Sequence, residues 1–373
     1  MDLALPGIGD PRRQAVRRWL ESHPSPTGRQ LAEAGYVAPH WPEPYGLGAD
    51  PIHQLVIDEE LKTHGVRRPD NAIGIGWAGP TIIHAGTEQQ KDRYLLPLLA
   101  GEEIWCQLFS EPGAGSDLAS VTTRAVRDGD SYVVNGQKVW TSYAHIAEFG
   151  ILICRTDPSA AKHRGITYLI CPMGTPGIEI RPLVEMTGAH NFNEVFFSDV
   201  AIPVENRVGA ENGGWALAKV TLGNERVSLS GDGALWGRGP TAEDLLALVR
   251  SAGGCRDPIL TQRLAQLYIH AETLRLIRLR TLGSRIAGRP PGPEASLRKA
   301  LADAHGQEIM TLAKDLCGAA GMLDTAGPCG DESPVWPFGY LFSPALTIGG
   351  GTSEVQRNII AERVLGLPHD LGA

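Results

Sequence analysis

The chain has 373 residues, a mass of 40.0 kDa and a formal net charge of −8. An acidic chain without a run of Lys or Arg lacks the basic patch of a nucleic-acid-binding surface, so nucleic acid is not expected as a partner. The longest apolar stretches are far shorter than the roughly 20 residues that span a bilayer. The N-terminal residues also lack the pattern of a secretory signal peptide, so we expect a cytoplasmic protein without a membrane anchor.

Metal binding is not indicated by the spacing of its usual ligands. The six cysteines form no CxxC pair, and the eleven histidines form no HExxH motif. Isolated cysteines in a long chain are usually buried thiols. We therefore expect reduced structural cysteines and propose no metal site.

Residues 1–104 show the pattern of amphipathic helices. The segments 10–22 and 50–65 each begin with Asp-Pro, and the segments 50–65 and 86–102 each have glycine near their end. Proline at the first turn and glycine after the last turn are typical helix boundaries. We expect an N-terminal helical domain over 1–104.

Residues 105–212 are rich in short β-type runs bounded by Gly and Pro. In "YVVNGQKVW" (132–140), Asn135-Gly136 lies between two alternating apolar runs, which predicts a hairpin turn at these two residues. Four further runs follow between 150 and 203. We expect a middle β-domain over 105–212.

Helical patterns return over residues 213–373. The segment 258–288 has apolar residues at spacings of three and four, residues 288–296 form a proline-glycine break, and 352–368 predict a last helix. The order is helical, then β, then helical, so the fold class is α+β and mainly α.

Two glycine- or aromatic-rich stretches in the β-domain are candidates for ligand contact. "SEPGAGSD" (110–117) offers the hydroxyls of Ser110 and Ser116 and a glycine-rich backbone that could approach a phosphate or a flat ring, but it also fits a plain β-turn. In "KVWTSYA" (138–144), Trp140 and Ser142 could cover an aromatic ring and hydrogen-bond to its edge, or Trp140 could be a core residue.

Two stretches in the C-terminal region are also candidates. "GNERVSLSG" (223–231) places Glu225 and Arg226 among small or apolar residues, where a carboxylate could act as a base, although a solvated helix pair is also possible. "GGGTSEVQRN" (349–358) predicts a flexible loop before a helix whose capping box is formed by Ser353 and Gln356. That helix start could bind an anion or be a plain cap.

The order and spacing of these stretches resemble the acyl-CoA dehydrogenase family. The resemblance is carried by residues 79–102, 106–120, 132–156, 196–209 and 349–368, and it is weak over 231–344. It implies an N-terminal helical domain, a middle β-barrel or sandwich domain and a C-terminal four-helix bundle. It also implies FAD as cofactor, an acyl-CoA thioester as substrate, and oxidation of its Cα–Cβ bond to a trans-2-enoyl-CoA.

The resemblance assigns flavin contacts in the β-domain. Ser110 matches a hydroxyl that touches the flavin ring, and Trp140 and Ser142 match the aromatic residue and the hydroxyl donor beside it. Gly115 and Ser116 match the segment near the flavin pyrophosphate, where the serine also approaches the CoA.

In the C-terminal region, Thr352 matches a threonine at the adenine half of FAD. The catalytic base departs from the commonest pattern, because Gly350 stands where many members carry Glu. Glu225 matches the alternative base that some members supply from the first bundle helix, and Arg226 matches an arginine beside it. Without a carboxylate at Gly350, the substrate side has room for an acyl group bulkier than a straight chain.

Two departures affect the partner half of the expected FAD site. The R-x-x-F-G segment is missing, and Q-x-x-G-G-x-G-Y is degraded to "DLCGAAGML" (315–323), with Asp315 at the position of the Gln and Ala319 in place of a glycine. An Asp beside a diphosphate would repel it. We therefore expect either a homodimeric or homotetrameric dehydrogenase that reduces an electron-transfer flavoprotein, or one subunit of a heterotetramer with a related chain. A non-catalytic or repurposed member of the fold is the third alternative.

Overall fold

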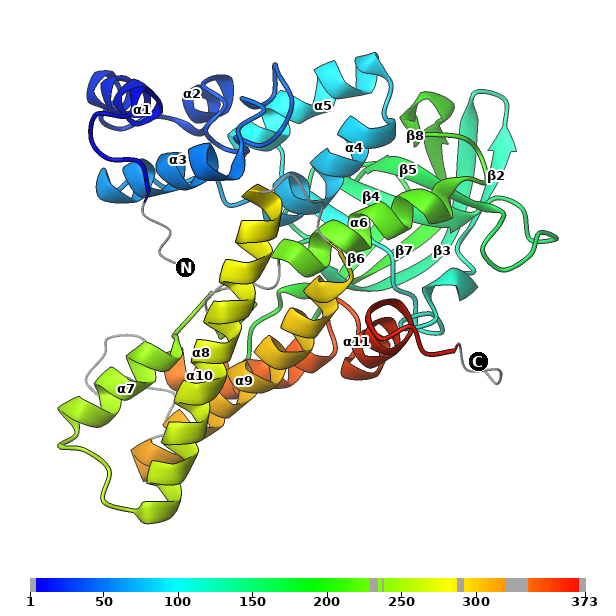
Figure 1. The fold of residues 1–373 in the computed structure, drawn as a ribbon. Coiled ribbons are helices and arrows are strands. Elements are labelled where there is room, and N and C mark those ends of the chain that lie inside the picture. The colour runs from blue at the N-terminus through cyan, green and yellow to red at the C-terminus, as the bar shows by residue number, and fades with distance from the viewer. Residues whose placement is uncertain (1–4, 229–233, 237, 287–291, 320–334, 369–373) are drawn as a thin grey trace. The chain divides into compact units, whose positions relative to one another are not determined.

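The protein is described by a computed structural model over residues 5–228, 234–236, 238–286, 292–319 and 335–368. The chain divides into two compact units, which are described one at a time. Unit 1 comprises Met1–Glu185 and His190–Asn224, and unit 2 comprises Met186–Ala189 and Glu225–Ala373. Unit 1 holds the first helices and the sheet (Figure 1), and unit 2 is helical. The expected α+β fold is therefore confirmed.

Three helices at the start of unit 1, at 11–22, 51–63 and 88–100, begin and end close to where the sequence predicts, whereas the helices at 28–33 and 79–85 were not individually predicted. Asp10 and Asp50 cap helices whose first residue is proline, and Gly101 has φ +70° directly after the last helix of the group. The elements are α1 (Pro11–Ser22), α2 (Gly28–Glu33), α3 (Pro51–Thr63), a π-helical turn (Gly74–Ala78), α4 (Gly79–Ala85) and α5 (Glu88–Ala100).

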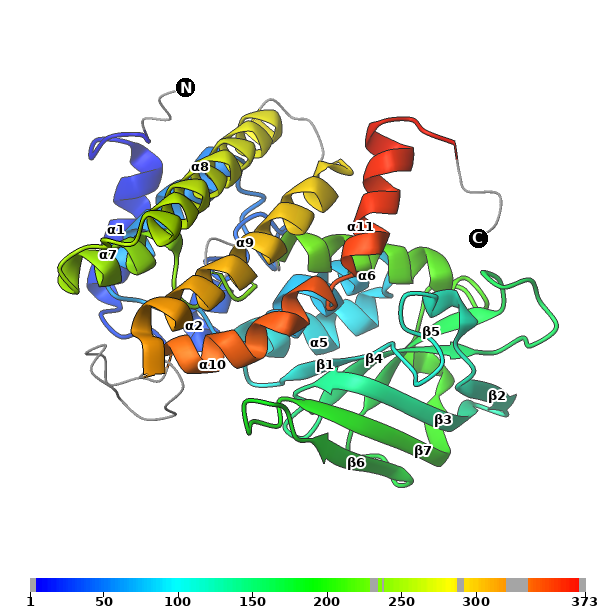
Figure 2. The same ribbon diagram turned by 90° about the horizontal axis from the view of Figure 1, so that it is seen from below.

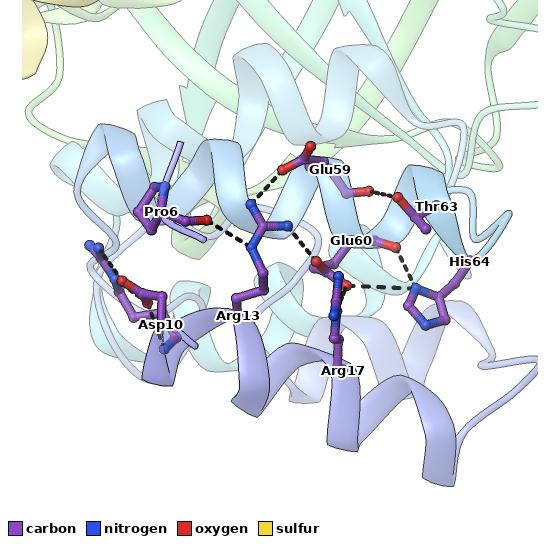
Figure 3. Close-up of polar contacts among 9 residues, drawn as sticks. Pro6, Asp10, Arg13, Arg17, Glu59, Glu60, Thr63 and His64 are labelled. Carbon is purple, nitrogen blue, oxygen red and sulfur yellow. Dashed lines mark hydrogen bonds and ion pairs between the residues drawn. The ribbon is translucent and has the colours of Figure 1, made fainter. Parts of the chain in front are cut away.

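A buried ion cluster joins α1 to α3 (Figure 3). The carboxylate of Glu60 on α3 is bound by the guanidinium groups of Arg13 and Arg17 on α1, at 2.7 Å in the case of Arg17. Arg13 also contacts Glu59, whose side chain is about half exposed, whereas the Glu60 side chain is only 1% exposed. The cluster therefore fixes the packing of α1 on α3 from inside the unit.

Eight strands of unit 1 form one sheet with the order β6-β7-β3-β2-β4-β5-β8, and β1 pairs in parallel with β4. The strand pairs that extend over the most residues are the antiparallel pairs of β3 with β7 and of β4 with β5. The strands are β1 (Trp105–Leu108), β2 (Arg124–Asp128), β3 (Ser131–Ser142), β4 (Phe149–Arg155), β5 (Ile166–Pro172), β6 (Ile178–Leu183), β7 (Phe192–Pro203) and β8 (Arg207–Val208).

The predicted hairpin turn at Asn135-Gly136 is wrong. Both residues lie inside β3, and the turn that joins β2 to β3 is at 129–130, because Asp128 pairs with Ser131. Gly136 has φ +151°, and a Cβ added there would lie 2.7 Å from the Cα of Thr123. The glycine therefore permits close approach of a neighbouring segment at a register shift in β3, rather than a turn.

Successive residues of β4 and β5 face two different hydrophobic cores. Ile151 and Ile153 pack against the N-terminal helices, whereas Leu152 and Cys154 pack in a second core with residues of β3 and β7. This alternation follows from the two-residue period of a strand. The central strands are buried on both faces, which explains why their sequence reads as a continuous apolar run.

In unit 2, helices α8, α9 and α10 lie side by side (Figure 2) around a core that includes Leu267, Met310 and Trp336. The helices are α7 (Ala242–Ser251), α8 (Pro258–Ile286), α9 (Glu294–Cys317), α10 (Val335–Phe342) and α11 (Ser353–Ile359), which continues into a π-helical turn (Ile360–Val364). A 3-10 helix (Ser343–Thr347) precedes three consecutive glycines at 349–351, which are called the glycine run below. Among the described residues, no helix has the length and apolar character to cross a membrane.

The remaining helix, α6 (Gly214–Ser228), spans the division between the units, with Asn224 in unit 1 and Glu225 in unit 2. Its first turns belong to the core of unit 1. Leu217 and Ala218 are buried there, and the Thr221 hydroxyl lies 3.0 Å from the Tyr168 hydroxyl.

Candidate functional site

The Ser110 turn of unit 1 lies beside the end of β3. The amide N–H of Val139 donates to the carbonyl oxygen of Ser110 at 2.9 Å. This backbone bond brings the first predicted hydroxyl next to the strand segment that carries the predicted aromatic residue, Trp140. Two stretches that are about thirty residues apart in the sequence therefore lie next to each other in the fold.

A buried ion pair holds the same turn. The ammonium group of Lys138 donates to Glu111 Oε1 at 2.8 Å and to the carbonyl oxygen of Phe109 at 2.9 Å. Burial alone would raise the pKa of Glu111, but the Lys138 ammonium and the hydrogen bonds to the carboxylate lower it to about 2. Glu111 is therefore ionised at neutral pH. Glu111 and Lys138 lie inside the sequence motifs 110–117 and 138–144, but the sequence indicated no role for either residue.

Trp140 is held out of the core in a strained backbone. Its side chain is 63% exposed and its φ is +59°, within a register shift of β3 between Lys138 and Thr141. One edge contact is made with Phe192, at 6.2 Å between ring centroids. Positive φ is uncommon for a bulky residue, and exposed Trp is uncommon, so both features favour a contact outside this unit over a role in its core.

The other predicted residues of unit 1 are accessible. Ser142 is half-buried at the end of β3. Gly115 and Ser116 are exposed on the loop 111–122, which follows Ser110. A Cβ added at Gly113 or Gly115 would meet no atom within 4 Å. Packing within the described chain therefore does not require glycine at these two positions, which leaves close approach of another molecule as a reason for it.

In unit 2, packing explains part of the glycine run. A Cβ at Gly349 would lie 2.6 Å from the ring of Trp236, and Gly350 and Gly351 have φ of +69° and +92°. A side chain at the second position, such as the Glu of many relatives, would have to adopt the left-handed conformation at a cost of about 1 kcal/mol.

The carbonyl groups of the glycine run are held from inside the unit. The amide of Gln356, which is fully buried, donates to Gly350 O at 2.9 Å and to Gly351 O at 3.2 Å. The predicted capping box of Ser353 and Gln356 is therefore wrong. The cap of α11 is Thr352, whose Oγ1 accepts from the N–H of Val355. Gln356 instead fixes the loop that precedes the helix.

We expect Gly349→Ala to destabilise unit 2 by about 1–3 kcal/mol, because the added methyl group must displace the Trp236 ring. Urea unfolding followed by tryptophan fluorescence measures this change. Gly174→Ala is the matched control, since its Cβ would meet nothing within 4 Å. An equal, small effect of both substitutions would contradict the packing role of Gly349.

The predicted base, Glu225, lies on α6 and is 6% exposed. The next residue, Arg226, is described only in its backbone, which continues the helix. The alternative of a solvated Glu-Arg pair is therefore wrong for Glu225. Among the described residues, no group of three or more His, Cys, Asp or Glu side chains could hold a metal ion.

Asp315, at the end of α9, is engaged within its own unit. Its carboxylate lies 2.8 Å from Nη1 of Arg263 on α8, and Arg263 also contacts Glu308 at 3.0 Å. Hydrogen bonding to Arg263 lowers the pKa of Asp315. The last residues of the degraded motif, 320–323, lie outside the described residues.

Three domain models of one family match the chain along most of its length. They are the N-terminal domain of acyl-CoA dehydrogenase at residues 10–102, its middle domain at 106–200 and its C-terminal domain at 212–365. A curated relative of similar length is the acyl-CoA dehydrogenase IpdE1 of Mycobacterium tuberculosis, which is 39% identical over 98% of this chain and 93% of its own.

The chain belongs to the acyl-CoA dehydrogenase family. The expected family and three-part architecture are thereby confirmed, and so, at the level of the family, is an oxidoreductase that acts on acyl-CoA.

Other relatives of this acyl-CoA dehydrogenase chain differ in length and assembly. FadE34 of Mycobacterium tuberculosis is 44% identical over 91% of this chain, which spans only 45% of FadE34. Two solved structures share the fold across 99% of this chain and 100% of theirs. They are the Tcur3481-Tcur3483 steroid ACAD, with a TM-score of 0.81 and 32% identity, and the ChsE4-ChsE5 complex from Mycobacterium tuberculosis, with a TM-score of 0.79 and 33% identity.

Members of this family are FAD flavoproteins, and the residues of unit 1 fit that cofactor. An exposed Trp140 can cover a flat ring, the hydroxyls of Ser110 and Ser142 can hydrogen-bond to its edge, and the open loop at Gly115 admits a phosphate close to the backbone.

Proposed function

We propose that this chain catalyses FAD-dependent α,β-dehydrogenation of an acyl-CoA thioester to the trans-2-enoyl-CoA. The observation that carries the proposal is Trp140, a large apolar side chain held 63% exposed in a left-handed backbone beside Ser110 and Ser142. Bound FAD would supply the acceptor for the β-hydride. The chain itself must bind the thioester, exclude water and remove the α-proton.

Glu225 is the proposed catalytic base. An α-proton beside a thioester is weakly acidic, so its removal needs a carboxylate that water does not stabilise. At 6% exposure Glu225 meets this requirement. Gly350, where many relatives carry the base, has no side chain and a backbone that disfavours one. A single carboxylate therefore serves the reaction in this proposal.

The remaining roles follow the family match. Ser110, Trp140 and Ser142 contact the flavin ring, and Gly115 and Ser116 lie along the pyrophosphate, with Ser116 also reaching CoA. Thr352 contacts the adenine half of FAD, although its hydroxyl already caps α11. Arg226 and Gly350 line the substrate side, and an electron-transfer flavoprotein reoxidises the enzyme.

The proposed substrate class is a bulky, ring-bearing acyl-CoA. Gly350 presents only backbone where a side chain would otherwise narrow the site, and the glycine on either side of it also lacks a side chain. The similarity to a structure described as a steroid ACAD agrees with a ring-bearing acyl group. A steroid-derived acyl-CoA is accordingly the first compound to try.

Absorbance spectroscopy of the purified protein tests the proposal. We expect a bound flavin spectrum that is bleached under anaerobic conditions by a ring-bearing acyl-CoA and more slowly by straight-chain acyl-CoAs. A flavin that is bleached by none of the panel, or no FAD uptake by the chain either alone or together with a related chain, would contradict it.

A second proposal is that the active enzyme is a heteromer in which a related chain completes the FAD site. It is favoured by Asp315, which stands where relatives hold the FAD diphosphate with Gln and which is neutralised by Arg263. Arg263 is also paired with Glu308, and Lys314 lies 3.2 Å from Asp315, so these two described cations are both engaged by carboxylates rather than by a phosphate. The ChsE4-ChsE5 complex provides a precedent among similar structures.

Co-expression with a related chain tests the second proposal. Native mass spectrometry and flavin absorbance should give a mixed oligomer with one FAD for every two chains. A homo-oligomer of this chain alone, with one FAD in each subunit, would refute the heteromer while leaving the proposed reaction intact.

A further inference from the structure

The Lys138 side chain is fully buried although it carries a charge. It is 0% exposed, and its partner Glu111 is 4% exposed. Removing two charges from water is costly, and an apolar pair of the same size is often as stable, so a buried pair of this kind is weak evidence for a stabilising role. Its contacts indicate a different role.

The first set of contacts surrounds Ser110. Lys138 donates to the carbonyl of Phe109 and to the carboxylate of Glu111, the residues directly before and after Ser110. The neighbouring amide of Val139 donates to the carbonyl of Ser110 itself. Three consecutive residues of the turn are thus bound to two consecutive residues of β3.

The second set of contacts closes the loop at its far end. Glu111 Oε2 accepts from the amide of Thr122 at 2.7 Å and from its hydroxyl at 2.8 Å, and Oε1 accepts from the amide of Thr123 at 2.9 Å. One carboxylate therefore joins both ends of the loop 111–122 and connects them, through Lys138, to the strand that presents Trp140.

We propose that Lys138 and Glu111 are positioning residues for the flavin site, which set the location of the Ser110 hydroxyl relative to Trp140. Neither side chain is exposed to contact a ligand, so both act through the turn that they hold. The inference rests on the proposed function for its ligand, FAD, but the contacts that carry it lie wholly within unit 1.

The double variant Lys138→Met/Glu111→Gln separates positioning from stability. It leaves no uncompensated charge, and Gln can still accept from Thr122 or Thr123, so the thermal unfolding midpoint should stay within a few degrees of the parent. The tether to the Phe109 carbonyl is lost, because Met has no donor. We expect at least about tenfold weaker FAD binding, measured by titration of the apoprotein.

Hydrogen exchange provides a readout that does not depend on FAD. In the double variant the amide of Val139 and those of Thr122 and Thr123 should exchange at least about tenfold faster than in the parent, while amides of β4 and β5 stay unchanged. Arg29→Met/Glu102→Gln is the matched control, since it removes an ion pair of the same unit whose side chains are 38% and 44% exposed. The control should change neither measurement.

Unchanged exchange and unchanged FAD affinity in a folded double variant would overturn the inference. If the parent takes up no FAD either alone or together with a related chain, the proposed function fails while the exchange data still decide whether the pair positions the turn. Lys138→Met alone provides a further check, because it leaves Glu111 ionised and buried. It should lower the unfolding midpoint more than the double variant does.

Discussion

Glu225→Gln should reduce the rate of flavin bleaching by acyl-CoA by about three orders of magnitude or more, while the protein keeps its bound flavin. Positioned acid–base groups typically contribute 10²–10⁴-fold, and the amide cannot accept the α-proton. Gln has the same shape as Glu, so this buried position stays filled. Anaerobic stopped-flow absorbance measures the loss directly, apart from any later electron transfer.

Two further variants make this result specific. Glu225→Asp keeps a carboxylate but withdraws it by one methylene, so we expect partial activity with a rate between those of parent and Gln variant. Glu354→Gln removes an acid of the same unit whose side chain is 75% exposed, and it should leave the rate unchanged. A Glu225→Gln protein that bleaches at the parental rate would exclude this residue as the base.

Local sequence signals predicted the starts of α1 and α3 well, although they misplaced the cap of α11. Asp10 and Asp50 cap helices that start with proline, and the residues that decide those boundaries are adjacent in the chain. The prediction of a turn at Gly136 was wrong for the opposite reason. Glycine is required at this position because Thr123, from the segment before β2, lies too close for a Cβ atom. No local sequence pattern distinguishes this requirement from a turn.

The candidate site divides in the same way. The types of Ser110, Trp140 and Glu225 could be matched to a family motif, and their roles in binding and catalysis stay predictions. The residues that hold the site could not be found from the sequence, because their function is defined by contacts. Gln356 looked like a helix cap but binds two glycine carbonyls, and Lys138 looked like an ordinary strand residue but is fully buried.

The ion cluster of α1 and α3 gave no sequence signal either, and it leads to the largest stability effect that we expect. Glu60→Gln should lower the free energy of unfolding by about 3 kcal/mol, because the buried Arg13 keeps only the half-exposed Glu59 as a counter-charge and Gln has one acceptor oxygen instead of two charged ones for Arg13 and Arg17. Urea unfolding monitored by circular dichroism at neutral pH measures this loss.

Glu59→Gln is the matched control, since it removes the other carboxylate on Arg13 at a position that is about half exposed. It should cost less than about 1 kcal/mol. Equal effects of the two substitutions would show that burial of Glu60 is not what makes the cluster important.

The pH dependence gives an independent check on Glu60. Burial opposes its ionisation, but hydrogen bonds from Arg17 and Arg13 outweigh this and leave the pKa below the usual 4.5. The unfolded chain therefore binds a proton at higher pH than the folded chain does. The stabilisation from Glu60 is complete above about pH 5 and is lost as the pH falls through 4.5 toward the folded pKa.

The parent should lose more stability than Glu60→Gln across this pH interval, because Gln has no proton to bind. Parallel plots of unfolding free energy against pH for the two proteins would contradict this origin of the stabilisation.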